Sequence, residues 1–129
     1  MAPGKGRSRA VAGIGLSVPD RTTGKLLRIF VDEDDRFDGR PLYMALVDAL
    51  KASGFAGATV LKGIEGFGVH KTVHAARTFD QSTNLPILIE VIEEETKILA
   101  FLPTLRSMIS EGLITLEKLE LMRISRGAP

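Results

Sequence analysis

The chain of 129 residues contains no cysteine and no tryptophan, and only 5% of it is aromatic. The lack of cysteine excludes a disulfide framework, thiolate metal sites and cysteine nucleophiles, and it fits the cytoplasmic location that we predict. The few aromatic residues are not interleaved with basic ones, so stacking platforms for single-stranded nucleic acid are not expected. No apolar run approaches the roughly 20 residues of a membrane span, so we predict no direct membrane insertion.

The net charge is only +1, but it is unevenly distributed. Residues 1–24 carry four basic residues and one acidic residue, +4 − 1 = +3, whereas the remainder carries 13 basic and 15 acidic residues, 13 − 15 = −2. The mildly acidic remainder lacks the basic stripe of a nucleic-acid-binding protein, which excludes that partner. We predict a disordered N-terminal tail over residues 1–24 and a single domain over residues 25–126.

Apolar periodicity predicts six elements in this domain. The expected strands cover residues 25–34, 57–65, 86–94 and 113–124, and the polar stretch 32–39 is expected to be a loop. One helix is expected to start at Pro41 and stop at Gly54. The second helix is expected over 93–112, with a kink at Pro103 and its end at Gly112. Its inward-facing residues are expected to be Ile98, Leu102, Leu105 and Ile109.

The resulting order, βαββαβ, predicts an α+β ferredoxin-like sandwich. Both crossovers are expected to be right-handed, which places two helices on one face of a four-stranded antiparallel sheet. The other face would then carry Leu26 and Phe30 without cover. We therefore expect the chain to associate with copies of itself.

The connection between the second and third expected strands is unusually long. About twenty residues join them, where two to five would make a hairpin, and long connections in compact domains are often functional. Gly63, Gly66 and Gly68 near its start have two interpretations. Their backbone could approach an anion, or they could simply form the strand end and a turn.

The runs GRPLYMALVDALKASGFAGATVLKGIEGFGVH, LPILIEVIEEETKILAFLP and EGLITLEKLELMRI resemble domain of unknown function 190, a family of small bacterial and archaeal proteins. That family is similar to the nitrogen regulatory PII signalling proteins. The resemblance implies a PII-like homotrimer that binds adenine nucleotides in the clefts between subunits. It also implies that a long loop, here residues 66–85, contacts a protein partner such as a membrane transporter or an enzyme.

The PII resemblance implies roles for particular residues. The motif Gly66-Phe67-Gly68 and Lys71 match the start of the PII loop, and His70 stands where PII proteins have glutamine. The resemblance also suggests Arg77 from the loop and Arg123 after the last strand. The implied ligand-binding residues are Gly66, Phe67, Gly68, His70, Lys71, Arg77 and Arg123. The connection 110–112 is too short for the glycine-rich phosphate loop of PII proteins, which favours a monophosphate, a cyclic nucleotide or a simple anion over a triphosphate.

Two further groups suggest metal chemistry as an alternative. His70 and His74 are four residues apart, so a helix would place both imidazoles on one face. The acidic run Asp32 to Asp38 could supply oxygen ligands, but it lacks the spacing of a calcium-binding loop, and a solvated loop is the favoured interpretation. The alternative function is a metal-binding or metal-sensing trimer that uses His70 and His74, with ion homeostasis as its context.

No catalytic constellation is recognisable in the sequence. It contains no nucleophile elbow, no zinc-protease helix and no phosphate-binding Walker loop, so we predict that the protein is not an enzyme. The leading hypothesis is a PII-like signalling protein that needs no cofactor beyond its ligand, an adenine nucleotide or another small anion. Ligand binding is expected to order residues 66–85, which would then engage the partner.

Overall fold

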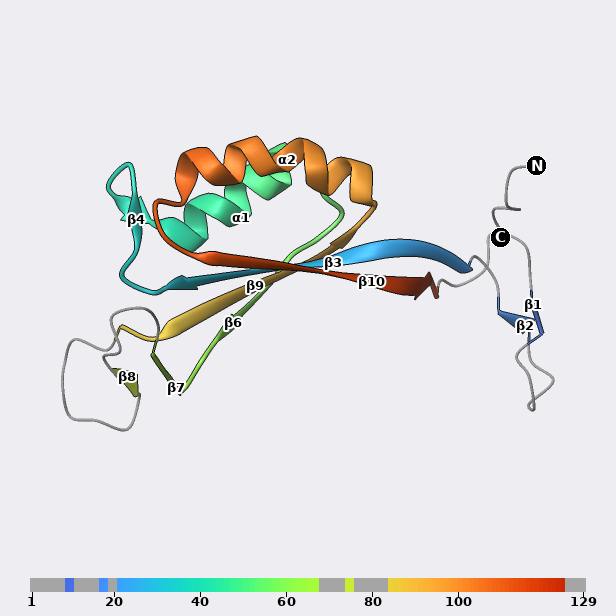
Figure 1. Cartoon of the computed structure of the whole chain (residues 1–129), viewed down its shortest axis with the longest axis horizontal. Helices are drawn as coiled ribbons and strands as arrows, with labels where there is room; N and C mark the ends of the chain where they lie inside the picture. Colours follow the sequence, from blue (N-terminus) through green and yellow to red (C-terminus); the bar gives the residue numbers. More distant parts are fainter. Residues whose placement is uncertain (1–8, 11–16, 19–20, 68–73, 76–83, 125–129) are drawn as a thin grey trace.

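The computed structural model describes residues 9–10, 17–18, 21–67, 74–75 and 84–124 (Figure 1). Ten strands and two helices lie in this part of the chain: β1 (Arg9–Ala10), β2 (Ser17–Val18), β3 (Arg21–Asp32), β4 (Arg36–Phe37), β5 (Arg40–Pro41), α1 (Leu42–Ala52), β6 (Thr59–Lys62), β7 (Glu65–Gly66), β8 (His74–Ala75), β9 (Pro86–Glu93), α2 (Glu95–Met108) and β10 (Leu113–Met122).

The main sheet has four strands in the order β10-β3-β9-β6, and every neighbouring pair is antiparallel. Both helices cover the same face of this sheet, and no described helix covers the other face (Figure 1). The predicted ferredoxin-like fold is therefore confirmed. Because β3 and β9 are the central strands, they supply the middle of the core.

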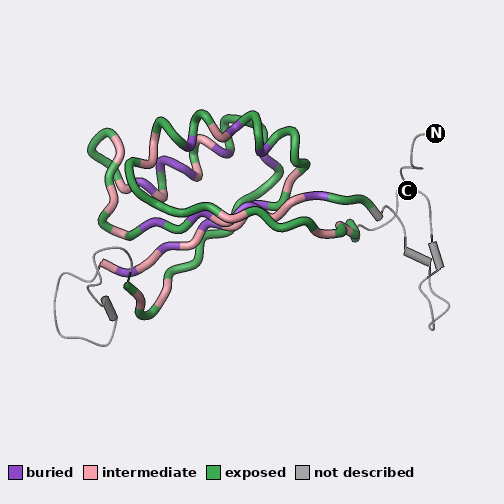
Figure 2. The backbone as a smooth tube through the Cα atoms, in the orientation of Figure 1, coloured by how far each residue is buried: buried purple, intermediate pink, exposed green. Residues whose placement is uncertain are grey.

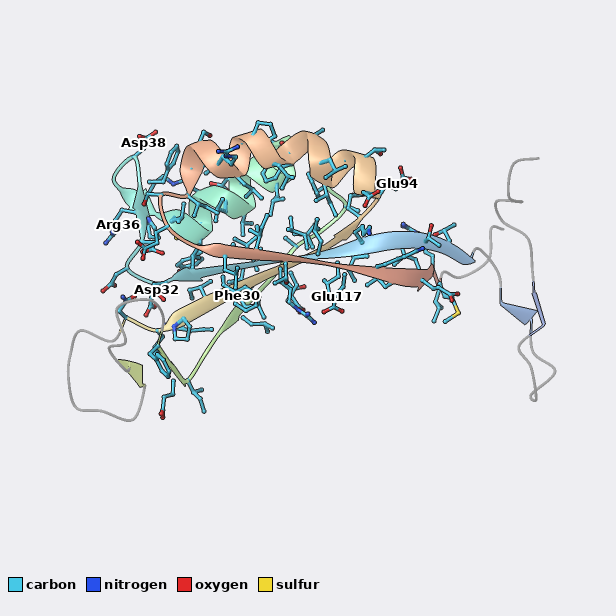
Figure 3. The ribbon with its side chains drawn as sticks, in the orientation of Figure 1. Phe30, Asp32, Arg36, Asp38, Glu94 and Glu117 are labelled. Atoms are coloured by element: carbon cyan, nitrogen blue, oxygen red, sulfur yellow. The ribbon has the colours of Figure 1, made fainter. Side chains whose placement is uncertain are left out.

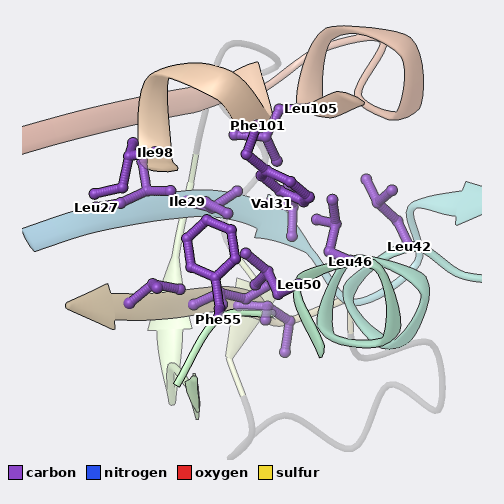
Figure 4. Packing of buried hydrophobic residues seen from close by; sticks show 13 residues of the cluster. Leu27, Ile29, Val31, Leu42, Leu46, Leu50, Phe55, Ile98, Phe101 and Leu105 are labelled. Atoms are coloured by element: carbon purple, nitrogen blue, oxygen red, sulfur yellow. The ribbon is translucent and has the colours of Figure 1, made fainter. Parts of the chain in front are cut away.

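The core lies between the sheet and the helices, where buried positions alternate along the central strands (Figure 2). Leu27 and Ile29 of β3 and Ile89 of β9 have no exposed surface, and Phe55 and Phe101 meet edge to face with ring centroids 5.2 Å apart. Figure 4 shows β3 side chains packing against those of both helices. Burial of each such side chain contributes about 1.5–3 kcal/mol, so this layer provides most of the stability.

Helix α1 begins and ends as its sequence predicts. Pro41 precedes its first residue and needs no backbone donor there, and Leu46 and Leu50 are buried against the sheet. Gly54 adopts a φ of 82°, which favours glycine, and the chain then turns so that the amide of Phe55 donates to the carbonyl of Leu50 at 3.2 Å.

Helix α2 differs from the prediction at its buried face and at its end. It is one helix through Pro103, as expected, but the buried residues are Ile98, Phe101 and Leu105. The predicted inward residues Leu102 and Ile109 are only partly buried. The helix ends at Met108, because Ile109 is already extended (φ −101°, ψ 113°) and begins the return to β10.

Gly112 does not close helix α2, contrary to the prediction. It lies where the chain approaches β3 closely: a Cβ at this position would be 3.1 Å from the carbonyl oxygen of Phe30 and 2.9 Å from Cγ2 of Ile109. A side chain would therefore crowd the start of β10.

The first main strand starts earlier than predicted. β3 begins at Arg21, so residues 21–24 belong to the sheet and not to the tail, because residues 119–122 of β10 supply their hydrogen-bond partners. β1 and β2 pair with each other, with Arg9 opposite Val18. The other positions of the predicted disordered tail lie outside the described residues.

The stretch between β3 and α1 was predicted to be a plain loop, but it contains a small hairpin. β4 and β5 pair, and the turn between them is Asp38-Gly39 with positive φ angles of 51° and 76°. Two consecutive positive φ angles are typical of a type I′ turn, for which Asp-Gly is a preferred sequence. The dipeptide was the signal that the prediction overlooked.

Candidate functional site

The long connection leaves and re-enters the sheet at one end, where β3 also finishes (Figure 1). β6 ends at Lys62 and its neighbour β9 begins at Pro86. In between, β7 and β8 pair antiparallel, with Gly66 opposite His74, so the connection starts as a two-stranded extension of its own. The candidate site is consequently built on the ends of β3, β6 and β9.

Two glycines allow the chain to pass close to Pro86. The amide of Gly63 donates to the carbonyl of Pro86 at 2.8 Å. A Cβ on Gly63 would lie 2.6 Å from Cγ of Pro86, and a Cβ on Gly66 would lie 3.0 Å from the same atom. Of the two interpretations of these glycines, this geometry supports the structural one at Gly63, where a side chain would collide with the proline ring.

An ion pair closes the base of the connection. Nζ of Lys62 lies 2.5 Å from Oε2 of Glu33, and the backbone amide of Glu33 donates to the carbonyl of Leu85 at 2.8 Å. The hydrogen bond from Lys62 lowers the pKa of Glu33, and the same bond raises the pKa of Lys62. Both groups are therefore charged at neutral pH.

The other acidic residues of this region shape the turn after β3. A side-chain oxygen of Asp35 accepts from the amide of Asp32 at 2.8 Å, and the side-chain oxygen of Asn84 accepts from the amide of Asp34 at 2.8 Å. Asp32 and Asp34 are exposed. This arrangement agrees with a solvated loop, and the described residues contain no group of three His, Cys, Asp or Glu side chains arranged to hold a metal ion.

Only some of the predicted ligand-binding residues are among the residues that the structure describes. Gly66 is in β7, and Phe67 follows it with 68% of its surface exposed. The backbone of His74 is in β8. The other predicted residues of the loop lie outside the described residues, so their roles stay predictions: Gly68, His70, Lys71 and Arg77.

Arg123 is exposed and directly follows β10, which ends at the opposite end of the sheet from β7, the strand that contains Gly66 (Figure 1). Along β3, Asp32 is opposite Pro86 whereas Arg21 is opposite Met122, a separation of 32 − 21 = 11 residues. At about 3.3 Å per residue the two ends are about 36 Å apart. A single chain therefore does not bring Arg123 to the base of the connection.

The face of the sheet opposite the helices is largely apolar. We call it the open face. Figure 3 shows Phe30 and Glu117 on this side. The register places Leu113 and Leu61 in the same row across the sheet as Phe30, whereas Ile92 lies further along, opposite Leu26. The following are each at least 39% exposed: Phe30, Leu61, Ile92 and Leu113. The exposed apolar group around Phe30 is typical of an interaction surface.

One ion network interrupts the open face. Nε of Arg28 donates to Oε2 of Glu90 at 2.9 Å, and Nη1 of Arg28 donates to Oε1 of Glu117 at 2.7 Å. The hydrogen bond to Glu90 is the main cause of a raised pKa of Arg28, and the hydrogen bond to Glu117 is the second. The network carries one positive and two negative charges, so the centre of the open face is acidic.

Among the described residues no polar or charged side chain is buried, and no described helix is long and apolar enough to cross a membrane. The prediction that the protein is not an enzyme stays a prediction.

The sequence interpretation missed the pair of Lys62 and Glu33. The acidic run was interpreted as a solvated loop, and Lys62 was assigned only to a strand. The two residues are 29 positions apart, 62 − 33 = 29, and meet because β9 brings the ends of β3 and β6 together. Only the strand order could have revealed the contact.

Comparison with known families gives one match over most of the chain. Residues 24–121 match the model of the DUF190 family, which is described as an uncharacterized ACR. A UPF0166 protein of Aquifex aeolicus (strain VF5) is 42% identical over 98 residues, which cover 76% of this chain and 92% of the relative. A UPF0166 protein of Methanocaldococcus jannaschii is 42% identical over 91 residues, which cover 70% of this chain and 83% of the relative.

Solved structures with a similar fold are PII-like proteins. CPII of Thiomonas intermedia K12, a nitrogen regulatory PII-like protein described as bound to ADP, AMP and bicarbonate, has a TM-score of 0.55 at 18% identity, covering 81% of this chain and 92% of CPII. A putative PII-like signalling protein of Thermus thermophilus has a TM-score of 0.55 at 21% identity, covering 81% of this chain and 93% of that protein. At such identities the likeness establishes the fold.

Proposed function

The chain belongs to the DUF190 family, and we propose that it is a PII-like regulatory protein that binds a small anionic ligand in the clefts between the subunits of a cytoplasmic homotrimer. The ligand class is an adenine nucleotide or another small anion such as bicarbonate. The proposed binding residues, which lie at the start of the long connection, within it and after β10, are Gly66, Phe67, Gly68, His70, Lys71, Arg77 and Arg123.

One observation carries this proposal. The long connection starts and ends where β3 and β6 finish and β9 begins, in a fold whose solved representative CPII is described as bound to ADP, AMP and bicarbonate. Loops placed on a rigid scaffold are a common position for ligand binding. The fold and the position of the connection together support an anion site at its base.

The open face supports the homotrimer. Its exposed apolar side chains would be covered if three sheets faced one another, which is favourable at about 25 cal/mol for each Å² of apolar surface removed from water. Because Arg123 is about 36 Å from the base of the connection, it reaches this region only in an arrangement where a neighbouring subunit supplies it. Both features favour a site that several chains complete.

The charge at the end of the sheet also favours a composite site. Residues 32–38 contain five acidic residues and one basic residue, −5 + 1 = −4. This charge repels an anion, so the proposed cations Lys71, Arg77 and Arg123 have to offset it. The connection 109–112 between α2 and β10 is too short to surround a triphosphate, which favours one or two phosphates or bicarbonate.

In this proposal residues 66–85 contact a protein partner, a membrane transporter or an enzyme, after the ligand has bound. Deletion of residues 69–83 tests the division of roles. The bond from Gly63 to Pro86 and the pair of Lys62 and Glu33 lie outside the deletion, so the fold should remain. Partner capture should be lost, and loss of the folded assembly would contradict the proposal.

Ligand binding is tested by the shift of the thermal unfolding midpoint and by isothermal titration calorimetry. The panel contains ADP, AMP, a cyclic nucleotide, bicarbonate and divalent metal ions. A ligand that binds only the folded protein stabilises it by about 2.7 kcal/mol at a hundredfold excess over its dissociation constant. The shift should disappear in Lys71→Ala. It should persist in Lys51→Ala, a matched control at the end of α1.

Two outcomes would overturn the proposal. If no anion in the panel shifts the unfolding midpoint, the site does not bind this class of ligand. If only metal ions shift it, and the shift is lost in the His70→Ala, His74→Ala double variant, the metal-sensing alternative replaces the anion site.

A further inference from the structure

The base of the long connection carries one cation among its described residues. In residues 59–67 and 84–86, Lys62 is the only lysine or arginine. It is the last residue of β6, next to Gly63, and half of its side-chain surface is exposed. Its ammonium group can donate to a carboxylate, as it does to that of Glu33, or to an oxygen of an anionic ligand.

Glu33 is held more firmly than Lys62. Its side chain is 25% exposed against 50% for Lys62, and its backbone amide is bonded to Leu85. The register explains the geometry: Glu33 follows Asp32, which is opposite Pro86, and Lys62 is opposite Ile87. The ion pair therefore spans the first residues of β9, at the point where the connection re-enters the sheet.

From this geometry we propose that Lys62 is a further ligand-binding residue and that Glu33 is its built-in competitor. In the absence of ligand, Glu33 holds Lys62 across the start of β9. A phosphate or bicarbonate oxygen at the base of the connection takes the place of the carboxylate on Nζ of Lys62. Ligand binding thereby breaks the ion pair that links the end of β3 to the end of β6, at the base of the long connection. This inference rests on the anion site of the proposed function.

The ion pair of Glu33 and Lys62 is weak enough for an anionic ligand to compete with Glu33. A partly exposed ion pair of this kind contributes little to stability, so an anionic ligand can replace it. While the pair is formed, Lys62 is unavailable, and the apparent affinity is reduced by the fraction of molecules in which it is free. For an exposed pair this reduction amounts to about 1.5- to 5-fold.

The experiment measures the affinity of the full-length protein for ADP and, separately, for bicarbonate by isothermal titration in four variants. Glu33→Gln should bind about 1.5- to 5-fold more tightly, because Lys62 is released. Lys62→Met should bind more weakly, and Lys62→Arg should restore much of the loss. In the Glu33→Gln, Lys62→Met double variant the gain from Glu33→Gln should vanish.

Removal of any nearby negative charge also favours an anion, so a matched control is needed. Asp34→Asn removes the charge of the next residue, whose backbone amide is bonded to Asn84. The gain in Glu33→Gln should exceed the gain in Asp34→Asn. Thermal unfolding of each variant without ligand verifies the fold.

The outcomes separate this inference from the proposed function. Wild-type protein that binds neither ADP nor bicarbonate nor any other anion of the panel would overturn both. Wild-type binding with equal gains in Glu33→Gln and Asp34→Asn, or a gain that survives in the double variant, would overturn only the competition. Unchanged affinity in Lys62→Met would remove Lys62 from the site.

Discussion

Replacement of Phe30 by serine should weaken the homotrimer. Phe30 lies on the open face near the end of β3, with Leu88 opposite it on β9 and Leu113, the first residue of β10, opposite it on β10. It is 39% exposed in the single chain although it belongs to a central strand of the sheet. In an assembly in which open faces meet, this exposed part is covered by a neighbouring subunit.

The magnitude follows from the exposed area. A phenylalanine has about 200 Å² to bury, so a fraction of 39% leaves about 80 Å² uncovered. At about 25 cal/mol per Å², covering this area contributes about 2 kcal/mol per subunit, or about 6 kcal/mol in a trimer. A loss of about 2 kcal/mol per subunit corresponds to about 30-fold weaker association for each subunit.

Sedimentation velocity over a wide range of protein concentrations measures this change. Leu99→Ser is the matched control, because Leu99 is 49% exposed on α2, on the other side of the sheet. It should leave the association unchanged. Equal association of wild-type and Phe30→Ser protein would show that the open face is not the interface. A monomeric wild-type protein would refute the homotrimer itself.

Three further predictions concern stability, each measured by urea unfolding. Ile89→Ala should destabilise the fold by about 2–5 kcal/mol, because Ile89 has no exposed surface in the centre of the core; a smaller loss would mean that the core relaxes around the cavity. Gly63→Ala should cost about 1–3 kcal/mol, since the new Cβ would lie 2.6 Å from Cγ of Pro86, while Gly57→Ala, with nothing within 4 Å, is the control. The pKa of Glu33 lies below its ordinary value of 4.5, so its pair with Lys62 stabilises the fold fully above that pH and loses its effect as the pH falls through the lowered value. The stability difference between wild-type and Glu33→Gln protein should therefore be constant near neutral pH and shrink on acidification, and a difference that grows in acid would contradict the pair.

Most of the fold could be predicted from local patterns. Alternation in residues 25–34 and 86–94 indicates strands with one buried face, and Pro41 and Gly54 mark the ends of α1 because proline needs no donor and glycine accepts a positive φ. The errors concern element ends, the missed hairpin of β4 and β5, and the buried face of α2. Met108 ends α2 because the chain must turn back to β10 there, and β3 extends to Arg21 because β10 is long enough to pair with it.

The candidate site was predictable only in position. An excess of residues between two strands identifies the connection, and the long runs of the domain, such as GRPLYMALVDALKASGFAGATVLKGIEGFGVH, identify the family. The apolar residues of the open face were partly recognised through Leu26 and Phe30, because the order of elements leaves one sheet face without helices. Which side chains would meet across strands was not contained in these patterns.

The sequence by itself determined the number, order and type of the main elements, since apolar periodicity and the special backbone of proline and glycine act over a few residues. The tertiary structure alone decided the contacts between distant residues. Glu33 meets Lys62, and Arg28 joins Glu90 and Glu117, because the strand order places β9 between β3 and β6 and places β10 beside β3. Such contacts depend on which strands pair and in which register, and register is set by the packing of the whole sheet.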